Sequence, residues 1–209
     1  MFKPFLTILV LLWCQGTLAA QTILVLGDSL SAGYGMQVSE SWPSLLQERL
    51  HQDGLNYKVH NASISGQTTS EGVRQIDQLL AITQPSLVIL ELGANDGLRG
   101  LSLAEMETNL SNMVAKAKAA KAEVLMLGIR VPQNFGRRYS SLFEKTFATV
   151  TQSHNVTLIP RLLSPLEAII TQENRSSYIQ TDGLHPTALA QPLILDHLYP
   201  QIKMLLGAK

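Results

Sequence analysis

Short apolar runs alternate along this chain with longer segments whose apolar residues recur at helical spacing. Each run is bounded by Gly, Pro, Asn or Ser, which is typical of buried strands. The alternation predicts an α/β protein, a three-layer α/β/α sandwich with a five-stranded parallel sheet between two layers of helices. The expected strands are 23–26, 57–60, 87–92, 124–127 and 156–159, and the expected helices are 41–53, 69–82, 102–122, 140–153, 165–171 and 187–206.

Several helix ends carry recognisable signals. Ser41 can cap the first of these helices, and Pro43 is tolerated in its first turn. Ser102 followed by Glu105 predicts a capping box. In the last helix, Pro192 predicts a local irregularity.

The N-terminal segment has the pattern of an export signal. Lys3 precedes an almost wholly apolar stretch at 5–13, and small residues follow as far as Ala20. The stretch is shorter than the roughly 20 apolar residues that span a bilayer, and a buried N-terminal helix is the alternative. We expect residues 1–20 to be a cleaved signal peptide and 21–209 to be one domain, periplasmic or secreted, with no stable membrane anchor.

Composition narrows the classes of partner. The chain has 16 Lys and Arg against 16 Asp and Glu, and its longest basic cluster is Arg137-Arg138, which argues against nucleic-acid binding. Its one cysteine, Cys14, falls in the expected signal peptide, so the mature chain has neither a disulfide nor a thiol nucleophile. The histidines at 51, 60, 154 and 197 lack partners at metal-ligand spacing, and no phosphate-loop or dinucleotide pattern occurs. No metal or cofactor is therefore expected.

Three polar motifs stand where strands end. The first strand runs into Gly27-Asp28-Ser29, and ligands bind at the carboxyl edge of open α/β sheets, so Ser29 is a candidate nucleophile. Gly66 and Asn95 follow the second and third strands, where a backbone N–H and a side-chain amide can face a developing oxyanion. Taken singly, each of these residues could equally serve a turn or cap a helix.

A fourth motif, Asp182-Gly183-Leu184-His185-Pro186, precedes the last helix. Two intervening residues allow one loop to place the Asp182 carboxylate beside the His185 ring. Asp182 would orient the imidazole, and His185 would take the proton of Ser29 and later return it to the leaving group. The alternatives are a helix-capping aspartate and a surface histidine.

All four motifs, in this order, resemble the blocks of the SGNH or GDSL hydrolases, without the G-x-S-x-G elbow of α/β-hydrolases. The segments 27–35, 93–100 and 182–186 are most similar to the bacterial periplasmic subgroup of multifunctional acyl-CoA thioesterase, lysophospholipase and arylesterase. The resemblance implies a flavodoxin-like strand order of 2-1-3-4-5. It also implies a catalytic triad of Ser29, Asp182 and His185, and an oxyanion hole formed by Ser29, Gly66 and Asn95.

The expected function is hydrolysis of carboxylic esters and thioesters through an acyl-enzyme on Ser29. Aryl esters, acyl-CoA and lysophospholipids are the expected substrates, and the enzyme is expected to act as a monomer. Leu98 and Arg99 are candidate substrate contacts, and the loops at 97–101 and 130–137 are expected to shape the acyl groove. Two alternatives remain: a carbohydrate O-deacetylase, or an exported binding protein without turnover. Asp28 is expected to brace the loop by hydrogen bonds rather than to transfer protons.

Overall fold

A computed structural model of the chain describes residues 20–207. The expected signal peptide at 1–20 lies outside the described residues except for Ala20, and Cys14 lies outside them too. Within 20–207, no helix has the length and apolar character needed to cross a bilayer.

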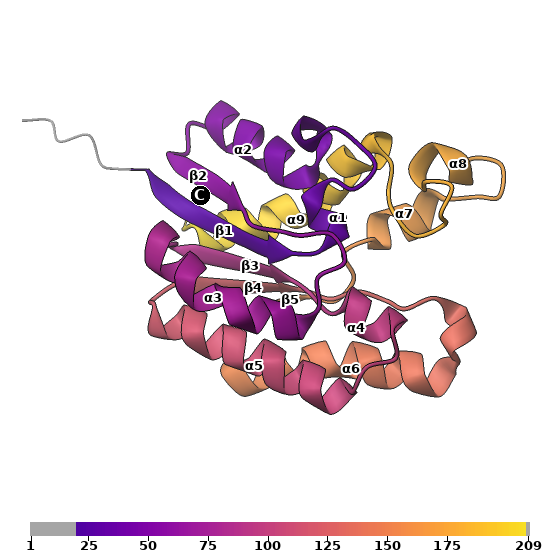
Figure 1. Ribbon diagram of the computed structural model, residues 1–209. Coiled ribbons are helices and arrows are strands. Elements are labelled where there is room, and N and C mark those ends of the chain that lie inside the picture. The colour runs from indigo at the N-terminus through magenta and orange to yellow at the C-terminus, as the bar shows by residue number, and fades with distance from the viewer. Residues whose placement is uncertain (1–19, 208–209) are drawn as a thin grey trace, which may run out of the picture.

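The centre of the molecule is a five-stranded parallel sheet (Figure 1). Its order is β2-β1-β3-β4-β5, so the expected 2-1-3-4-5 arrangement is confirmed. Parallel pairing brings the carboxyl ends of β1, β2 and β3 to one edge of the sheet, where the expected site residues follow. The strands are β1 (Gln21–Gly27), β2 (Tyr57–Asn61), β3 (Leu87–Glu91), β4 (Glu123–Leu127) and β5 (Thr157–Ile159).

Helices cover both faces of this sheet, which confirms the sandwich (Figure 1). One face carries α2 (Trp42–Gln52), α7 (Ser164–Ile169) and α9 (Gln191–Leu205). The other face carries α3 (Thr69–Thr83), α5 (Leu103–Ala119) and α6 (Arg137–His154). The short elements are α1 (Ser29–Ala32), α4 (Ala94–Leu98), α8 (Arg175–Tyr178), and the 3-10 turns Val38–Glu40, Gln133–Phe135 and Ala188–Ala190.

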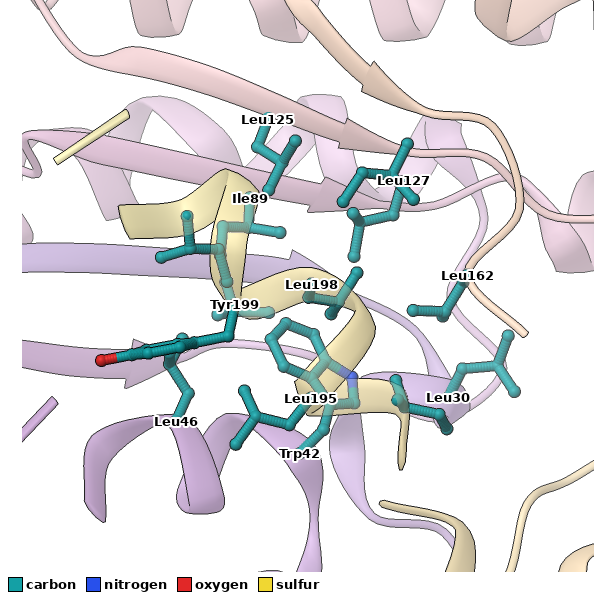
Figure 2. Close-up of a cluster of buried hydrophobic side chains, with 14 of the residues drawn as sticks. Leu30, Trp42, Leu46, Ile89, Leu125, Leu127, Leu162, Leu195, Leu198 and Tyr199 are labelled. Atoms are coloured by element: carbon teal, nitrogen blue, oxygen red, sulfur yellow. The ribbon is translucent and has the colours of Figure 1, made fainter. Parts of the chain in front are cut away.

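Strand periodicity divides the core into two clusters. Ile23 and Val25 of β1 pack toward α2 and α9, whereas Leu24 and Leu26 pack toward α3 and α5. Successive side chains of a strand point to opposite faces, so both faces must be apolar when both are covered. Figure 2 shows Leu198 of α9 among side chains from the sheet and from α2 in the first cluster.

Several helix boundaries differ from expectation, and α5 ends at Ala119 rather than at 122. Helix α6 begins at Arg137 rather than at 140. Helix α9 begins at Gln191, because Ala188–Ala190 form a separate 3-10 turn. Pro192 thus stands in the first turn, where its missing N–H has no intrahelical partner to lose, and the irregularity expected near it is the change from the 3-10 turn to the α-helix. The interior proline of α9 is Pro200.

The capping signals are also realised differently. Ser41 precedes α2, but its hydroxyl donates to the Val38 carbonyl at 2.7 Å instead of accepting from the helix. Ser102 does accept from the Glu105 N–H, at 3.3 Å. The complete capping box among the described α-helices lies at α3, where Thr68 N–H donates to Glu71 Oε2 at 2.7 Å.

Candidate active site

The turn after β1 presents Ser29 at the carboxyl edge of the sheet. Asp28 caps the short helix α1 by accepting the Leu30 N–H on Oδ1 at 3.1 Å. Ser29 is the first residue of α1, so its backbone N–H has no intrahelical acceptor and remains available to a ligand. Its side chain is half-buried. The expected bracing role of Asp28 agrees with this hydrogen bond.

The loop before α9 is organised around Asp182. Its Oδ1 accepts the backbone N–H of Leu184 at 2.9 Å and that of His185 at 3.0 Å. The hydrogen bond from the His185 N–H is the main cause that lowers the pKa of Asp182 to about 2. Asp182 is therefore an anion throughout the neutral and mildly acidic range.

A continuous hydrogen-bond chain joins this loop to Ser29. Asp182 Oδ2 lies 2.6 Å from His185 Nδ1, and His185 Nε2 lies 2.7 Å from Ser29 Oγ. The Tyr34 ring stacks against the imidazole, with ring centroids 4.4 Å apart. An anion beside Nδ1 favours the tautomer with its proton on Nδ1, which leaves Nε2 as the acceptor facing the hydroxyl.

Gly66 and Asn95 lie on the two neighbouring loops. Among the described residues, the Gly66 N–H has no hydrogen-bond acceptor. The Asn95 amide nitrogen is already engaged, since it donates to Asp28 Oδ2 at 3.1 Å and to the Gln67 carbonyl at 3.0 Å. An oxyanion would therefore have to compete with the Gln67 carbonyl for one hydrogen of Asn95.

Comparison with known proteins places the chain in a family. Residues 25–191 match the model of the GDSL-like lipase/acylhydrolase family. The chain belongs to this family. The hydrolase is 43% identical over 196 residues to an arylesterase of Vibrio mimicus, covering 93% of this chain and 95% of that protein. It is 40% identical over 204 residues to the thioesterase 1/protease 1/lysophospholipase L1 of Escherichia coli, covering 98% and 93%.

A solved structure gives the same result in three dimensions. The hydrolase superimposes on the psychrotrophic esterase EstA of Pseudoalteromonas, inhibited by monoethylphosphonate, with a TM-score of 0.82. The two chains are 41% identical, and the match covers 90% of this chain and 99% of that one. The family resemblance is thereby confirmed, and the protein is an SGNH hydrolase of carboxylic esters and thioesters.

Several residues of the hydrolase that the motifs did not single out support the site. Asp96 accepts the Thr69 N–H at 2.9 Å and the Thr69 hydroxyl at 2.6 Å, and so ties the Asn95 turn to the start of α3. Asn109 of α5 donates to the same hydroxyl at 3.1 Å. These contacts hold the Gly66 and Asn95 loops in one arrangement.

Gln180 links the catalytic loop to the turn after α1. Its amide nitrogen donates to the Tyr34 carbonyl at 2.8 Å and to the Pro186 carbonyl at 2.9 Å. Its backbone N–H donates to the His185 carbonyl at 2.8 Å. Gly35 makes room for it, because a Cβ there would lie 2.1 Å from Gln180 Oε1 at a positive φ of 73°. No sequence pattern marks Gln180, since its partners are distant in the chain.

Two buried carboxyl groups, those of Asp28 and Glu91, lie together beneath the Ser29 turn. Glu91 Oε2 accepts the Asp28 N–H at 3.2 Å and the Ser31 hydroxyl at 2.7 Å. Burial raises the pKa of Asp28 to about 6, and burial together with the Asp28 charge raises that of Glu91 well above its ordinary value. A lone glutamate ending an otherwise apolar strand was the available sequence signal.

The candidate substrate contacts lie on the rim of this edge. Leu98 is 37% exposed at the end of α4. Arg99 is exposed and donates to the Gly66 carbonyl at 2.8 Å, so it contacts the Gly66 loop directly. In the loop at 130–137, Arg130 is paired with Glu144 and Glu167.

Residues 20–207 contain no group of three or more His, Cys, Asp or Glu side chains placed to hold a metal ion.

Proposed function

We propose that Ser29 is the nucleophile of this hydrolase and that His185 and Asp182 complete its catalytic triad. The observation that carries the proposal is the unbroken chain from Asp182 through His185 to the Ser29 hydroxyl, with contacts of 2.6 and 2.7 Å. Nucleophile, base and orienting carboxylate in hydrogen-bond contact are what activation of a serine requires.

In the acylation step, Ser29 Oγ attacks the substrate carbonyl carbon while His185 Nε2 takes the hydroxyl proton. Collapse of the tetrahedral intermediate breaks the bond to the alcohol or thiol, which leaves with that proton. A water molecule then attacks the acyl group by the same route, releasing the acid and restoring Ser29. Asp182, ionised throughout, stabilises the imidazolium formed in each half-reaction.

The negative charge on the substrate oxygen needs donors, and we assign them to Ser29 N–H, Gly66 N–H and the Asn95 amide. The first two have no competing acceptor that would have to be displaced. Asn95 would give up its hydrogen bond to the Gln67 carbonyl while keeping the one to Asp28.

We further propose aryl esters, acyl-CoA thioesters and lysophospholipids as substrates. The names of the Vibrio and Escherichia relatives support this range. Exposed apolar side chains, suited to an acyl chain longer than acetyl, lie on the segments that carry the site: Tyr34, Ile64, Leu98 and Leu184. Arg99 and Leu98 would contact the substrate, and the loops at 97–101 and 130–137 would border its acyl chain.

The rival substrate class is an acetylated carbohydrate. Comparing p-nitrophenyl acetate with the octanoate separates the two, because a deacetylase should lose activity as the acyl chain lengthens. We expect the octanoate to be hydrolysed with a kcat/KM at least equal to that of the acetate. A steep fall with chain length would favour the deacetylase.

The mature enzyme, residues 21–209, would be exported by the segment at 1–20 and would act as a monomer in the periplasm or outside the cell. Sizing of the purified mature chain and mass measurement of its N-terminus after export test both statements.

Fluorophosphonate labelling tests the nucleophile. The mature protein should be labelled stoichiometrically, because only an activated serine attacks phosphorus, and Ser29→Ala should abolish both labelling and ester hydrolysis. Ser153→Ala, at an exposed position of α6, is the matched control and should behave as wild type. A Ser29→Ala protein that still turns over would refute the assignment, and an unlabelled wild type would favour the non-catalytic binding protein.

A further inference from the structure

Two carboxyl groups are fully buried beneath the nucleophile's turn. Asp28 precedes Ser29, and Glu91 ends β3 at the position paired with Gly27 in the parallel ladder. Both side chains are 0% exposed. None of the ion pairs among residues 20–207 includes either of them, so no Lys or Arg neutralises the pair there.

Two buried neighbouring carboxylates without a cation destabilise the folded protein if both are ionised. Removing an ionised carboxylate from water is expensive, and a second negative charge close by adds repulsion, so a buried pair keeps a proton. Asp96 is a further acidic group near Asp28, and His185 is the one basic group that favours its charge.

Hydrogen bonding distinguishes the two carboxyl groups. Both oxygens of Asp28 accept from donors, Oδ1 from the Leu30 N–H and Oδ2 from the Asn95 amide, each at 3.1 Å. In Glu91 only Oε2 is satisfied, whereas Oε1 is buried without a partner. Charge is better tolerated on the carboxylate whose two oxygens both receive hydrogen bonds, so Asp28 is the better anion.

Close packing holds Glu91 against the turn. A Cβ added at Gly27 would lie 2.7 Å from Glu91 Oε2 and 3.0 Å from the Ser31 Cβ. Gly27 is not among the glycines with a positive φ. Glycine is needed there because a side chain would have no room, and not because of the backbone conformation. The glycine of the first motif thus admits the carboxyl group that binds Asp28 N–H and Ser31.

We propose that Asp28 and Glu91 retain one shared proton at neutral pH, that Glu91 carries it, and that Glu91 is a positioning residue for the nucleophile's turn. Neutral Glu91 accepts from Asp28 N–H and Ser31 and so orders the residues on either side of Ser29. Asp28 then remains as the one charged member of the pair, holding the Asn95 amide. The assignment of these residues to catalysis rests on the proposed function, whereas the retained proton does not.

The pH dependence of urea unfolding tests for the retained proton and does not require the protein to be active. In the unfolded chain Glu91 loses its proton above about pH 4.5, its ordinary value, whereas in the folded protein the raised pKa keeps it protonated. The folded wild type therefore becomes progressively less stable as the pH rises from 5 to 7, relative to Glu91→Gln, which has no proton to lose at this position. The ratio of wild-type to Glu91→Gln unfolding constants should rise about tenfold per pH unit.

Glu123→Gln is the matched control for this measurement. Glu123 is an exposed residue at the amino end of β4, the opposite edge of the sheet from the site, so its replacement leaves the buried carboxyl pair untouched. The ratio of the wild-type unfolding constant to that of Glu123→Gln should stay constant with pH. An equally flat ratio for Glu91→Gln would overturn the proposal, whatever the activity of either protein.

Carboxyl ¹³C NMR of glutamate-labelled wild type locates the proton, with the Glu91 resonance identified by its absence from Glu91→Gln. The resonance should keep the chemical shift of a protonated acid at pH 7, and the chemical shift of an ionised carboxylate there would overturn the assignment to Glu91.

In catalysis, Glu91→Ala should lower kcat at least about tenfold further than Glu91→Gln, because only the amide of Gln still accepts from Asp28 N–H and Ser31. Equal losses in the two variants would refute the positioning role.

Discussion

At the scale of single residues, the Asn95 amide has both a structural and a proposed catalytic role. Its amide holds the Asp28 carboxylate and the Gln67 carbonyl in the free enzyme, and we propose that it turns one hydrogen toward the oxyanion during catalysis. The hydrogen bond to Asp28 holds the amide at the site before the substrate arrives, so the reorganisation that remains is the loss of the Gln67 hydrogen bond.

Asn95→Ala should lower kcat by roughly 10²–10³-fold with little change in KM, because the lost hydrogen bond is strongest in the transition state. Steady-state hydrolysis of a p-nitrophenyl ester measures both constants. Asn112→Ala, at an exposed position of α5, is the control and should match wild type. A loss confined to KM would show that Asn95 binds the ground state instead.

The pH profile depends on which residues change charge. Asp182, with a pKa of about 2, stays ionised, and a general base must be unprotonated to act, so activity should rise as the pH increases from the acidic range. Burial raises the Asp28 pKa to about 6, so this group gains a proton below that pH and becomes a weaker acceptor for the Asn95 amide. The slope of log kcat/KM against pH should therefore steepen from one toward two below about pH 6.

Chromatographic detection of the released acid between pH 5 and 9 gives this slope independently of the chromophore's own ionisation. A circular dichroism spectrum at each pH establishes that the fold persists. A slope that stays at one down to pH 5 would contradict the part assigned to Asp28, and a rate independent of pH would contradict the base.

At the scale of elements, the site depends on how loops are fastened to one another. The catalytic loop has an antiparallel bridge between Ile179 and Pro186, and Gln180 fastens this bridge to the Tyr34 turn. Tyr34 in turn stacks on His185. The imidazole is thus held by a turn whose Tyr34 lies 146 residues before Gln180 in the chain.

Gln180→Ala should lower kcat about tenfold while leaving the unfolding transition cooperative, because two hydrogen bonds that set the loop's position are lost and the core is untouched. Ester kinetics with urea unfolding on the same preparation separates the two effects. Gln152→Ala, on the exposed side of α6, serves as the control. Unchanged kcat in Gln180→Ala would mean that Asp182 alone orders the loop.

At the scale of the whole molecule, α9 returns the chain from the catalytic loop across the sheet. Leu198 lies in the middle of this contact, fully buried among side chains of α2 and the strands (Figure 2). The same cluster includes Leu30, directly after the nucleophile, so the site rests on the core that holds α9 in place.

Leu198→Ala should destabilise the fold by about 2–5 kcal/mol, because it removes buried apolar surface and leaves a cavity. The folded fraction should retain its kcat, since Leu198 is a core residue that supplies no group to the proposed site. Leu142→Ala, at a position 48% exposed, should cost far less. Urea unfolding followed by circular dichroism measures both free energies, and equal values would contradict the assigned burial.

The sequence by itself determined the strands, their alternation with helices and the residues at the carboxyl ends of three strands. These features follow from local periodicity and from short motifs, which do not depend on distant contacts. Helix ends were less predictable, as at Ala188–Ala190, because a 3-10 turn and an α-helix share the same local pattern.

Only the tertiary structure decided which distant groups meet. Glu91 reaches Asp28 across 63 residues, Gln180 reaches Tyr34 across 146, and His185 reaches Ser29 across 156. The burial that raises the pKa values of Asp28 and Glu91 also arises only when helices close both faces of the sheet. Such contacts leave no periodic trace in the chain, because packing of whole elements brings their residues together.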